Sequence, residues 1–461
     1  MNRFAPSAVW VASCLYAATW FALGVRRYDI FRSSFDDGIF TQILASAFSG
    51  FRGTPEWNFN HLASHFSPDL FLVAPLVILT HSTISMIAVQ AIAVALVAPP
   101  LFLIARKRMP ESLAAGCAIV ALLYPPLAGL TFADFHENGI APTAIVWLLW
   151  AIDAGKGWIA LAIGLFALGI KEDMALGIFG GGLFGGLWLA RRGDRSRAGI
   201  ALGLAACAAL TFVGYLAILR PALHPPFPFQ QFRYYTGEGL GSTTPAAAWD
   251  RARYVVEMLL PLGFIPLLGP AVLLAIPGFV EILASRNPIT MSLETQYAAV
   301  WIGYMLFAFV AGVAVLHRRA PKASGFAVAA CAAISLYVLV VVDPLARWYA
   351  LYRWPNAHDA TLQALLDSLP RDASISAPDR IYSHLGFDPN AGIAPGGCFF
   401  IIDRTNNDVT PQWAQYEHDL PALVAAGTYR LIRATDGIEL YERRTSECTR
   451  RSPVGGEADR A

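Results

Sequence analysis

Residues 7–42 combine an apolar run, SAVWVASCLYAATWFALGV (7–25), with a basic stretch, RRYDIFR (26–32), and an acidic one, SSFDDGIFTQ (33–42). The apolar run is long enough to cross a bilayer as a helix, which takes about 20 residues. It exceeds the roughly 7–15 apolar residues of a secretory signal peptide, and no small-residue cleavage site follows it. We therefore expect an uncleaved first membrane span, followed by paired aspartates at the membrane surface.

The composition is that of a membrane protein. Hydrophobic residues make up 56% of the 461 residues and charged residues only 15%, whereas a soluble domain carries about 25% charged residues. The formal net charge of +1 provides no field that would attract nucleic acid. We expect an α-helical polytopic membrane protein in a lipid bilayer, with no nucleic-acid partner.

Apolar segments recur along the first three quarters of the chain. Segments 140–153 and 157–170 are short and are interpreted as a hairpin. Segment 254–284 is too long for one span and contains four prolines, so two tightly connected passes suit it better. Segment 69–80 is interpreted as re-entrant or interfacial. The total is about eleven spans by the length criterion, the best candidates being 7–25, 84–105, 113–130, 173–190, 198–219, 296–316 and 323–342.

Short basic loops set the predicted orientation, because Lys and Arg are enriched on the cytoplasmic side of membrane proteins. The loops at 106–108, 191–197 and 317–322 are basic and fall on one side of the predicted bilayer. We therefore expect a cytoplasmic N-terminus and an extracytoplasmic C-terminus. The polar segments between the spans then gather on the outer face, where we expect an active site.

The composition changes near residue 345 to that of a small soluble domain. We expect a membrane domain over 1–344, with 26–83 as its first outer loop, an extracytoplasmic α/β domain over 345–445, and a disordered tail over 446–461. Within the small domain the sequence predicts helices at DATLQALLDSLP and WAQYEHDLPALVAAG and strands at ASISAP, CFFIID and TYRLIRA.

The six cysteines show no metal-ligand or redox spacing. Four lie in apolar segments, where cysteine is usually a small buried hydrophobe. Cys398 and Cys448 lie in the polar C-terminal part and could pair if that part is extracytoplasmic. The sequence leaves their pairing open.

Asp36 and Asp37 follow the first predicted span. A carboxylate at a water-excluded outer surface can act as a general base on a hydroxyl or hold a divalent cation. Alternatively, one of the two caps a helix that begins near Gly38, by accepting hydrogen bonds from its free N–H groups. The two roles are compatible, since a capping carboxylate can also be a base.

His61 and His65 are four residues apart and would share one face of a helix. That spacing can bind zinc, but Leu62 stands where HExxH metalloproteases carry glutamate, and Pro68 would end the helix soon afterwards. Hydrogen bonding to a polar ligand and plain loop structure are the alternatives.

Asp134, His136 and Glu137 are crowded into one loop, FADFHENG (132–139), between apolar segments. They are candidates for catalysis or ligand binding, although acidic side chains also stabilise a helix N-terminus.

Lys171, Glu172 and Asp173 end a short apolar segment. The lysine could hold a phosphate as a point charge, or anchor the segment at the interface within an internal ion pair.

Two further outer loops carry candidate residues. Arg233 lies with Tyr234 and Tyr235 in a long loop that is a plausible lid over a ligand. Tyr297 and Glu281 flank the other loop, where an interfacial aromatic and a solvated charge are the default interpretations.

Several blocks of the sequence, taken in order, resemble a family of bacterial multi-pass membrane proteins described by a domain of unknown function and grouped by fold with the GT-C glycosyltransferases. The resemblance covers most of the chain. The blocks that carry it are FDDGIFTQ (35–42), HFSPDLFLVAPL (65–76), DFHEN (134–138), KED (171–173), PAVLLAIPGFVEILAS (270–285), QYAAVWIGYMLF (296–307) and SLPRDASISAPDRIYSHL (368–385).

The sequence departs from the family pattern at three positions. The first block resembles FDLGIFDQ, so Asp36 takes the acidic position, while Asp37 replaces an apolar residue and Thr41 a usually acidic one. Asp37 is therefore interpreted as a solvated neighbour or a helix cap. In the third block Glu137 stands where proline is common, which leaves its role open.

The resemblance implies an inverting glycosyltransferase of the bacterial cytoplasmic membrane that moves a sugar from a polyprenyl phosphate or diphosphate to an acceptor hydroxyl at the outer face. Asp36, in the first outer loop, is the predicted base. The alternatives are a transporter or flippase of a lipid-linked or polar solute, and a non-catalytic scaffold. A divalent metal is a candidate cofactor, with Asp36, His65, Asp134 and His136 as candidate ligands. The predicted catalytic residues are Asp36, Asp134 and His136, and the predicted substrate-binding residues are Gln42, His61, His65, Lys171, Glu172, Asp173, Arg233 and Tyr297.

Overall fold

The computed structural model describes residues 4–55, 58–229, 231–237, 245–342, 345, 353–370, 372–393, 396–405, 411–445 and 448. The chain divides into two compact units. The first comprises Met1–Ala22, Leu62–Leu70 and Ala88–Ala350, and the second comprises Leu23–His61, Phe71–Ile87 and Leu351–Ala461. Most of the predicted first outer loop therefore belongs to the same unit as the C-terminal segment.

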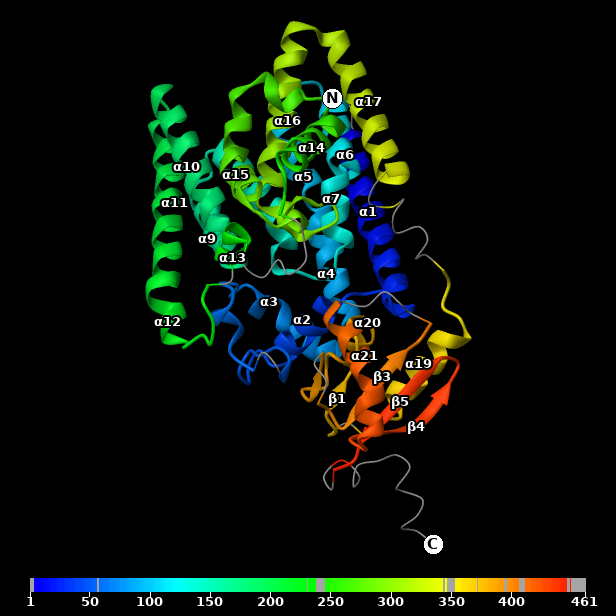
Figure 1. Cartoon of the computed structure of the whole chain (residues 1–461). Helices are drawn as coiled ribbons and strands as arrows, with labels where there is room; N and C mark the ends of the chain where they lie inside the picture. The colour runs from blue at the N-terminus through cyan, green and yellow to red at the C-terminus, as the bar shows by residue number, and fades with distance from the viewer. Residues whose placement is uncertain are drawn as a thin grey trace. The chain divides into compact units, whose positions relative to one another are not determined.

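Helices make up the first unit, and most of them match the apolar segments predicted from the sequence (Figure 1). A helix satisfies every backbone hydrogen bond within one segment, which is what an apolar environment demands. The helices are α1 Phe4–Asp29 and α4 Ile84–Ala95, which both also contribute to the second unit, and α5 Ala98–Ala105, α6 Glu111–Leu123, α7 Pro125–Phe132, α8 Ala141–Asp153, α9 Gly157–Ile170, α10 Met174–Arg191, α11 Arg195–Gly214, α12 Arg220–Ala222, α13 Gln231–Thr236, α14 Ala248–Leu259, α15 Ile276–Ala284, α16 Ala299–Arg319 and α17 Pro321–Tyr337.

Among the described residues, six helical stretches are long and apolar enough to cross a membrane, and a seventh is the α6–α7 pair, which bends by 47°. The protein is thus a multi-pass membrane protein. The prediction of about eleven spans also counted the hairpin helices α8 and α9 and two passes in segment 254–284, all of which fall below this length. Helix α3 (Leu70–Thr80), which was predicted to be re-entrant or interfacial, is also too short to span. The six stretches are Phe4–Asp29, Ile84–Ala105, Met174–Arg191, Arg195–Ala222, Gln296–Arg319 and Pro321–Val342.

Segment 254–284 differs from the prediction of two tight passes. Helix α14 ends at Leu259, and short 3-10 turns follow it up to Ala275, before the nine-residue α15. Each of these turns and α15 carries a proline at its first or second position. Proline lacks the N–H that a continuing helix needs, so the segment restarts repeatedly and forms no helix of spanning length.

Helix α16 is the most buried of the six stretches, with 78% of its apolar window buried. Trp301 on α16 is fully buried, and its indole Nε1 donates to the Tyr254 hydroxyl of α14 at 3.0 Å. Helices α10 and α11 lie side by side (Figure 1). Their close approach depends on Gly182, because a Cβ there would lie 2.6 Å from the carbonyl oxygen of Ala201.

The C-terminal part of the second unit folds around a small mixed sheet with strand order β2-β1-β3-β5-β4. Strand β1 pairs in parallel with β2 and β3, whereas β5 pairs antiparallel with β3 and β4. The predicted strands at ASISAP, CFFIID and TYRLIRA are confirmed, as are both predicted helices. The elements are α19 Ala357–Asp367, β1 Ile375–Ser376, α20 Asp379–Tyr382, β2 Ala391–Gly392, β3 Phe399–Asp403, α21 Pro411–Ala425, β4 Tyr429–Thr435 and β5 Ile438–Arg443.

Strands β2 and β5 were not predicted from the sequence. A signal for β5 was present, because Asp436 and Gly437 join it to β4 with positive φ angles of 50° and 78°. Asp-Gly with two positive φ angles is typical of a tight hairpin turn. The predicted helix at 413–427 packs on this sheet, since Trp413 of α21 stacks on Phe400 of β3 with ring centroids 5.0 Å apart.

Cys398 and Cys448 form a disulfide. The bond connects the start of β3 to a residue that follows β5, and thereby holds the end of the described chain to the sheet. The remainder of the predicted disordered tail lies outside the described residues.

His358, at the start of α19, lies between two carboxylates. Its Nδ1 is 2.9 Å from Asp436 and its Nε2 is 3.1 Å from Asp403. Partial burial lowers the pKa of His358, but the hydrogen bonds to the two aspartates outweigh that effect, so the pKa lies above its ordinary value.

Candidate functional site

The richest group of buried charges in the first unit gathers around Lys171, in the turn between α9 and α10. We call it the Lys171 cluster and define it as Glu137, Lys171, Glu172, Asp173 and Glu281, with His65 and Tyr215 beside them. Three of these charged side chains (Glu137, Lys171 and Glu172) are at most 8% exposed. Buried ionisable groups of this kind in a membrane protein mark functional sites by default.

Lys171 and Glu137 form a buried ion pair. The Lys171 ammonium lies 2.9 Å from Glu137 Oε1. Burial alone would lower the pKa of Lys171, but Glu137, Asp173 and Glu172 together raise it well above its ordinary value. The lysine therefore stays charged. An ammonium has three N–H donors, so the one directed at Glu137 leaves capacity for an anionic ligand.

Glu172 holds the neighbouring HFSPD segment in place. Its Oε1 lies 2.9 Å from His65 Nδ1, and its Oε2 accepts a hydrogen bond from the backbone N–H of Phe66 at 2.7 Å. Burial raises the pKa of Glu172, but His65, Lys171 and the hydrogen bonds outweigh that effect and lower it. Glu172 and His65, which were predicted separately as substrate-binding residues, thus contact each other across 107 residues of sequence.

Two carboxyl groups at this end of the helices titrate near neutrality. Burial raises the pKa of Asp173 to about 7, with repulsion from Glu172 and Glu137 adding to the effect and Lys171 opposing it. Burial alone raises the pKa of Asp69 to about 7. Asp69 lies beside the end of α9, where its backbone N–H donates to the carbonyl of Gly169 at 3.1 Å.

Polar atoms in or beside the Lys171 cluster are buried without a hydrogen-bond partner among the described residues. Leaving such an atom unpaired costs about 1–3 kcal/mol, and native interiors satisfy nearly all of them. Their accumulation at one place indicates that a polar ligand or water completes them. They are Asp69 Oδ2, Asn138 Oδ1, Asp173 Oδ1, Tyr215 OH and Glu281 Oε2.

Gln90 organises the DFHEN loop. Its Nε2 lies within hydrogen-bond distance of four carbonyl oxygens, including that of Asp134 at 3.4 Å, and its Oε1 accepts from the N–H of His136 at 3.1 Å. His136 Nδ1 is 2.8 Å from the Asp134 carbonyl. Asp134 and His136 are buried, at 5% and 8% exposure. The loop thus has a fixed conformation that presents Glu137 to Lys171.

Arg233 and Tyr297 both lie beside Tyr234, and the pKa of the neighbouring Tyr235 is raised by burial and by the charges of Glu281 and Asp173. Arg233 is exposed on α13, and its guanidinium carbon lies 5.9 Å from the ring centroid of Tyr234. The Tyr234 and Tyr297 hydroxyls are 3.0 Å apart. Part of the loop predicted to act as a lid lies outside the described residues, and its role stays a prediction.

The FDDGIFTQ block lies in the second unit, on helix α2 (Phe35–Ala45). The helix begins at Phe35 rather than near Gly38, and its N-cap residue, Ser34, makes no side-chain capping bond. Asp37 is completely buried and lies 3.8 Å from Arg27, so its interpretation as a solvated neighbour was wrong, while its role as a cap stays a prediction. Asp36 is only partly buried in the first turn of α2.

Gln42 joins α2 to the C-terminal segment of the same unit. Its Nε2 donates to the carbonyls of Asp388 and Ala391 at 2.7 and 2.9 Å, and its Oε1 accepts from the Tyr382 hydroxyl at 2.6 Å. The backbone of α2 also approaches this segment closely at Gly38, where a Cβ would lie 2.6 Å from the Tyr382 ring. The substrate-binding role of Gln42 stays a prediction.

His61 and His65 do not share a helix face. A 3-10 helix ends at Ala63 and a turn follows, because Pro68 and the segment before it cannot continue a helix. His61 is buried beside Phe40 and Phe51 in the second unit. Within the described parts of the chain, no three His, Cys, Asp or Glu side chains are grouped so that they could hold a metal ion.

Several residues of this site were not predicted from the sequence. Glu281 was interpreted as a solvated charge, but its Oε2 is buried and its charge is close enough to repel Asp173. Gln90, Asn138 and Tyr215 were not selected, and Gln90 and Asn138 are polar residues in or next to apolar segments, which is the signal that could have found them. Tyr215 begins a short π-helical stretch, a feature that a single sequence does not reveal.

The fold and the buried charges at the helix ends define the class: a multi-pass α-helical membrane protein with a small C-terminal sheet. The chain belongs to the family described as Predicted membrane protein (DUF2079), whose model matches residues 26–395. Its fold is similar to that of ArnT from Cupriavidus metallidurans, whose crystal structure contains bound undecaprenyl phosphate. The match has a TM-score of 0.57 at 14% identity and covers 95% of this chain and 98% of that one.

The family match confirms the predicted resemblance to a family of multi-pass membrane proteins, and the likeness to ArnT is one of fold. Functionally curated proteins give no match to the chain.

Proposed function

We propose that this protein is a membrane glycosyltransferase that moves a sugar from a polyprenyl phosphate or diphosphate to an acceptor hydroxyl at the outer face of the cytoplasmic membrane. The observation that carries the proposal is the set of buried, partnerless polar atoms around the buried cation Lys171. Similarity in fold to a protein that binds undecaprenyl phosphate supports the lipid carrier.

The partnerless atoms match the chemistry of a sugar. Carboxylate oxygens of Asp69, Asp173 and Glu281 and the amide oxygen of Asn138 accept hydrogen bonds. A sugar offers several hydroxyl donors within one small ligand, which a phosphate ester alone does not. The acceptors would therefore hold the sugar, while Lys171 would stabilise the phosphate that leaves.

The reaction needs a base more than an acid. The acceptor oxygen attacks the anomeric carbon, the bond from that carbon to the phosphate oxygen breaks, and the phosphate departs as an anion that a cation stabilises. The acceptor hydroxyl gives its proton to a carboxylate. We assign this role to Asp36, on the strength of the family pattern. The disulfide between Cys398 and Cys448 supports an oxidising, extracytoplasmic location of the C-terminal part.

The test compares glycolipids and glycoproteins of the cell envelope by mass spectrometry in cells that lack the protein and cells that regain it. Lys171→Met is compared with Lys156→Met, since the two lysines flank α9 at opposite ends. We expect Lys156→Met to restore the glycan profile and Lys171→Met and Asp36→Asn to fail at equal membrane expression. A glycan profile that does not change when the protein is removed would refute the function. Restoration by Asp36→Asn would refute only the role of the base.

A second candidate is a proton-coupled carrier of a lipid-linked or polar solute. Burial raises the pKa values of Asp69 and Asp173 to about 7. Carboxyl groups of this kind bind and release protons in proton-coupled carriers. Proteoliposomes loaded with a pH-sensitive dye distinguish the two candidates. Proton flux that depends on added undecaprenyl phosphate sugar, without sugar transfer, would favour the carrier.

A further inference from the structure

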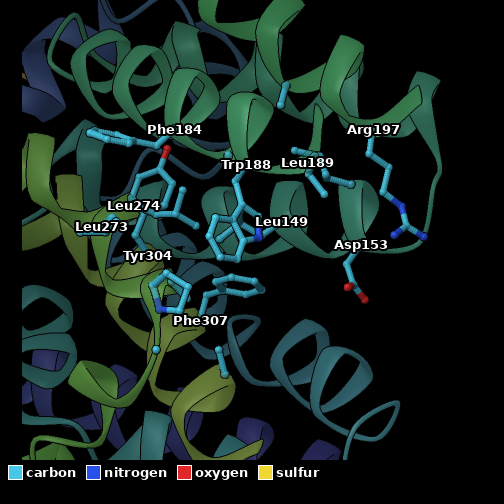
Figure 2. Close-up of a pocket in the computed structure, with 18 of the residues that line it drawn as sticks. Leu149, Asp153, Phe184, Trp188, Leu189, Arg197, Leu273, Leu274, Tyr304 and Phe307 are labelled. Carbon is cyan, nitrogen blue, oxygen red and sulfur yellow. The ribbon is translucent and has the colours of Figure 1, made fainter. Parts of the chain in front are cut away.

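A cavity of about 770 Å³ lies in the first unit between α8, α10, α11 and α16 and the turn before α15 (Figure 2). It lies toward the Arg191 end of α10. The Lys171 cluster lies beside the other end of α10, about 27 Å from Arg191 by the 1.5 Å rise of each of the 18 residues. None of the cluster's residues lines the cavity, whose wall on α10 begins at Ile178. The cavity therefore does not belong to the candidate active site.

The middle of the cavity is apolar and open at the side. Figure 2 shows Trp188 and Leu149 between Phe184 at one end and Arg197 and Asp153 at the other. Phe184 and Trp188 are 47% and 44% exposed, although α10 is one of the candidate membrane spans. Exposed apolar side chains on a membrane helix contact lipid chains, so the groove is accessible from the bilayer.

Arginines dominate the polar end of the cavity. Five arginines line it, and Asp153 is the only acidic residue among its lining residues. Asp153 is already bound to Lys107 and Arg108, and Arg197 pairs with Asp194. The other three arginines, Arg191, Arg192 and Arg318, have no ion pair with any residue that the structure describes. No described carboxylate pairs with these three charges at the rim of the apolar groove, where the Arg192 guanidinium lies over the Trp188 ring at 4.5 Å from its centroid.

We propose that this cavity binds an anionic phospholipid of the inner leaflet, with its phosphate at Arg191, Arg192 and Arg318 and an acyl chain along Trp188 and the leucines. An arginine guanidinium matches a phosphate with paired hydrogen bonds. Basic pockets between helices at the cytoplasmic side are suited to anionic headgroups, and the basic loops predict that this end is cytoplasmic. A free phosphate would leave the apolar groove empty, and a neutral lipid would leave the arginines uncompensated.

The test uses the purified, delipidated full chain and native mass spectrometry with an equimolar mixture of dioleoyl phosphatidylglycerol and dioleoyl phosphatidylethanolamine. The variant R191Q/R192Q/R318Q is compared with R106Q/R195Q/R319Q, which removes three arginines from the basic loops on the same predicted side of the membrane, none of which lines the cavity. We expect the affinity of the first variant for phosphatidylglycerol to fall by about tenfold or more, because each basic side chain near an anionic headgroup contributes roughly a factor of five to the binding constant. The control variant should retain it.

A groove-filling variant tests the apolar half without any change of charge. A Cβ at Gly185 would meet only the Leu274 side chain, at 3.6 Å, so Gly185→Leu is accommodated and projects into the groove. We expect it to weaken phosphatidylglycerol binding while leaving the thermal unfolding temperature unchanged. Equal losses in the two arginine variants, equal binding of phosphatidylethanolamine, or displacement of phosphatidylglycerol by equimolar undecaprenyl phosphate would overturn the proposal.

Discussion

Removing Lys171 should destabilise the protein in a manner that depends on pH. In Lys171→Met, Glu137 loses its partner at 2.9 Å while it remains 3% exposed. Breaking a buried ion pair on one side costs about 3–5 kcal/mol. Protonation of Glu137 limits that cost. Neutralising it at pH 7, about 2.7 units above its reference pKa of about 4.3, takes about 3.7 kcal/mol at 1.36 kcal/mol per unit.

The sign of the pH dependence follows from the same reasoning. In the variant, the folded state raises the pKa of Glu137 above its unfolded value. The stability of the variant is therefore fully present below the unfolded-state pKa of Glu137. It is lost as the pH rises above that value, by about 1.4 kcal/mol per pH unit. We expect a loss near 3–4 kcal/mol at pH 7 that falls to about half at pH 5.5.

Denaturant unfolding in detergent, followed by tryptophan fluorescence, measures these free energies. The double variant Lys171→Met/Glu137→Gln removes both charges and should recover most of the stability, because a neutral pair carries no uncompensated charge. A loss that does not change between pH 5.5 and 7, or a double variant as unstable as the single one, would refute the reasoning. Lys156→Met, at the exposed end of α9, provides the matched control.

Three further predictions concern the second unit. Replacing both Cys398 and Cys448 by alanine should lower its free energy of unfolding by about 4 kcal/mol, the loop entropy of a 50-residue separation, and a reducing agent should then have no further effect. His358→Gln should destabilise more at pH 5.5 than at pH 8.5 in thermal unfolding, because the stability that a raised pKa confers is lost as the pH rises through it. Gly38→Ala should cost about 1–3 kcal/mol by overpacking, whereas Gly199→Ala, with nothing within 4 Å of its Cβ, should not destabilise.

Local patterns predicted most of the elements. Long uncharged runs such as 296–316 became helices because a helix satisfies its own backbone, and CFFIID became a central strand because its apolar residues are buried on both faces. The prediction for segment 254–284 was wrong because its prolines were interpreted as tolerated within two tightly connected passes, whereas they begin a series of short turns.

Individual residues of the candidate site could be predicted from the sequence, but their contacts with one another could not. Lys171, Glu172 and His65 were selected as unusual charges near a membrane, but the sequence could not show that Glu172 binds His65 rather than its neighbour Lys171. Asp37 was misjudged for the same reason: its burial depends on Arg27 from the preceding helix. Pairings across long separations are set by tertiary packing, which no local spacing records.

The bonds of Gln42 also constrain how the chain is made. The carbonyl of Asp388 that it binds lies 346 residues further along the chain. At synthesis rates of roughly 5–20 residues per second, this partner emerges about 17–70 s after helix α2. During that interval the amide of Gln42 and the open side of Gly38 lack these native neighbours, so water must satisfy the amide until the segment around Asp388 has been synthesised. Truncation of the C-terminal segment would make that temporary state permanent.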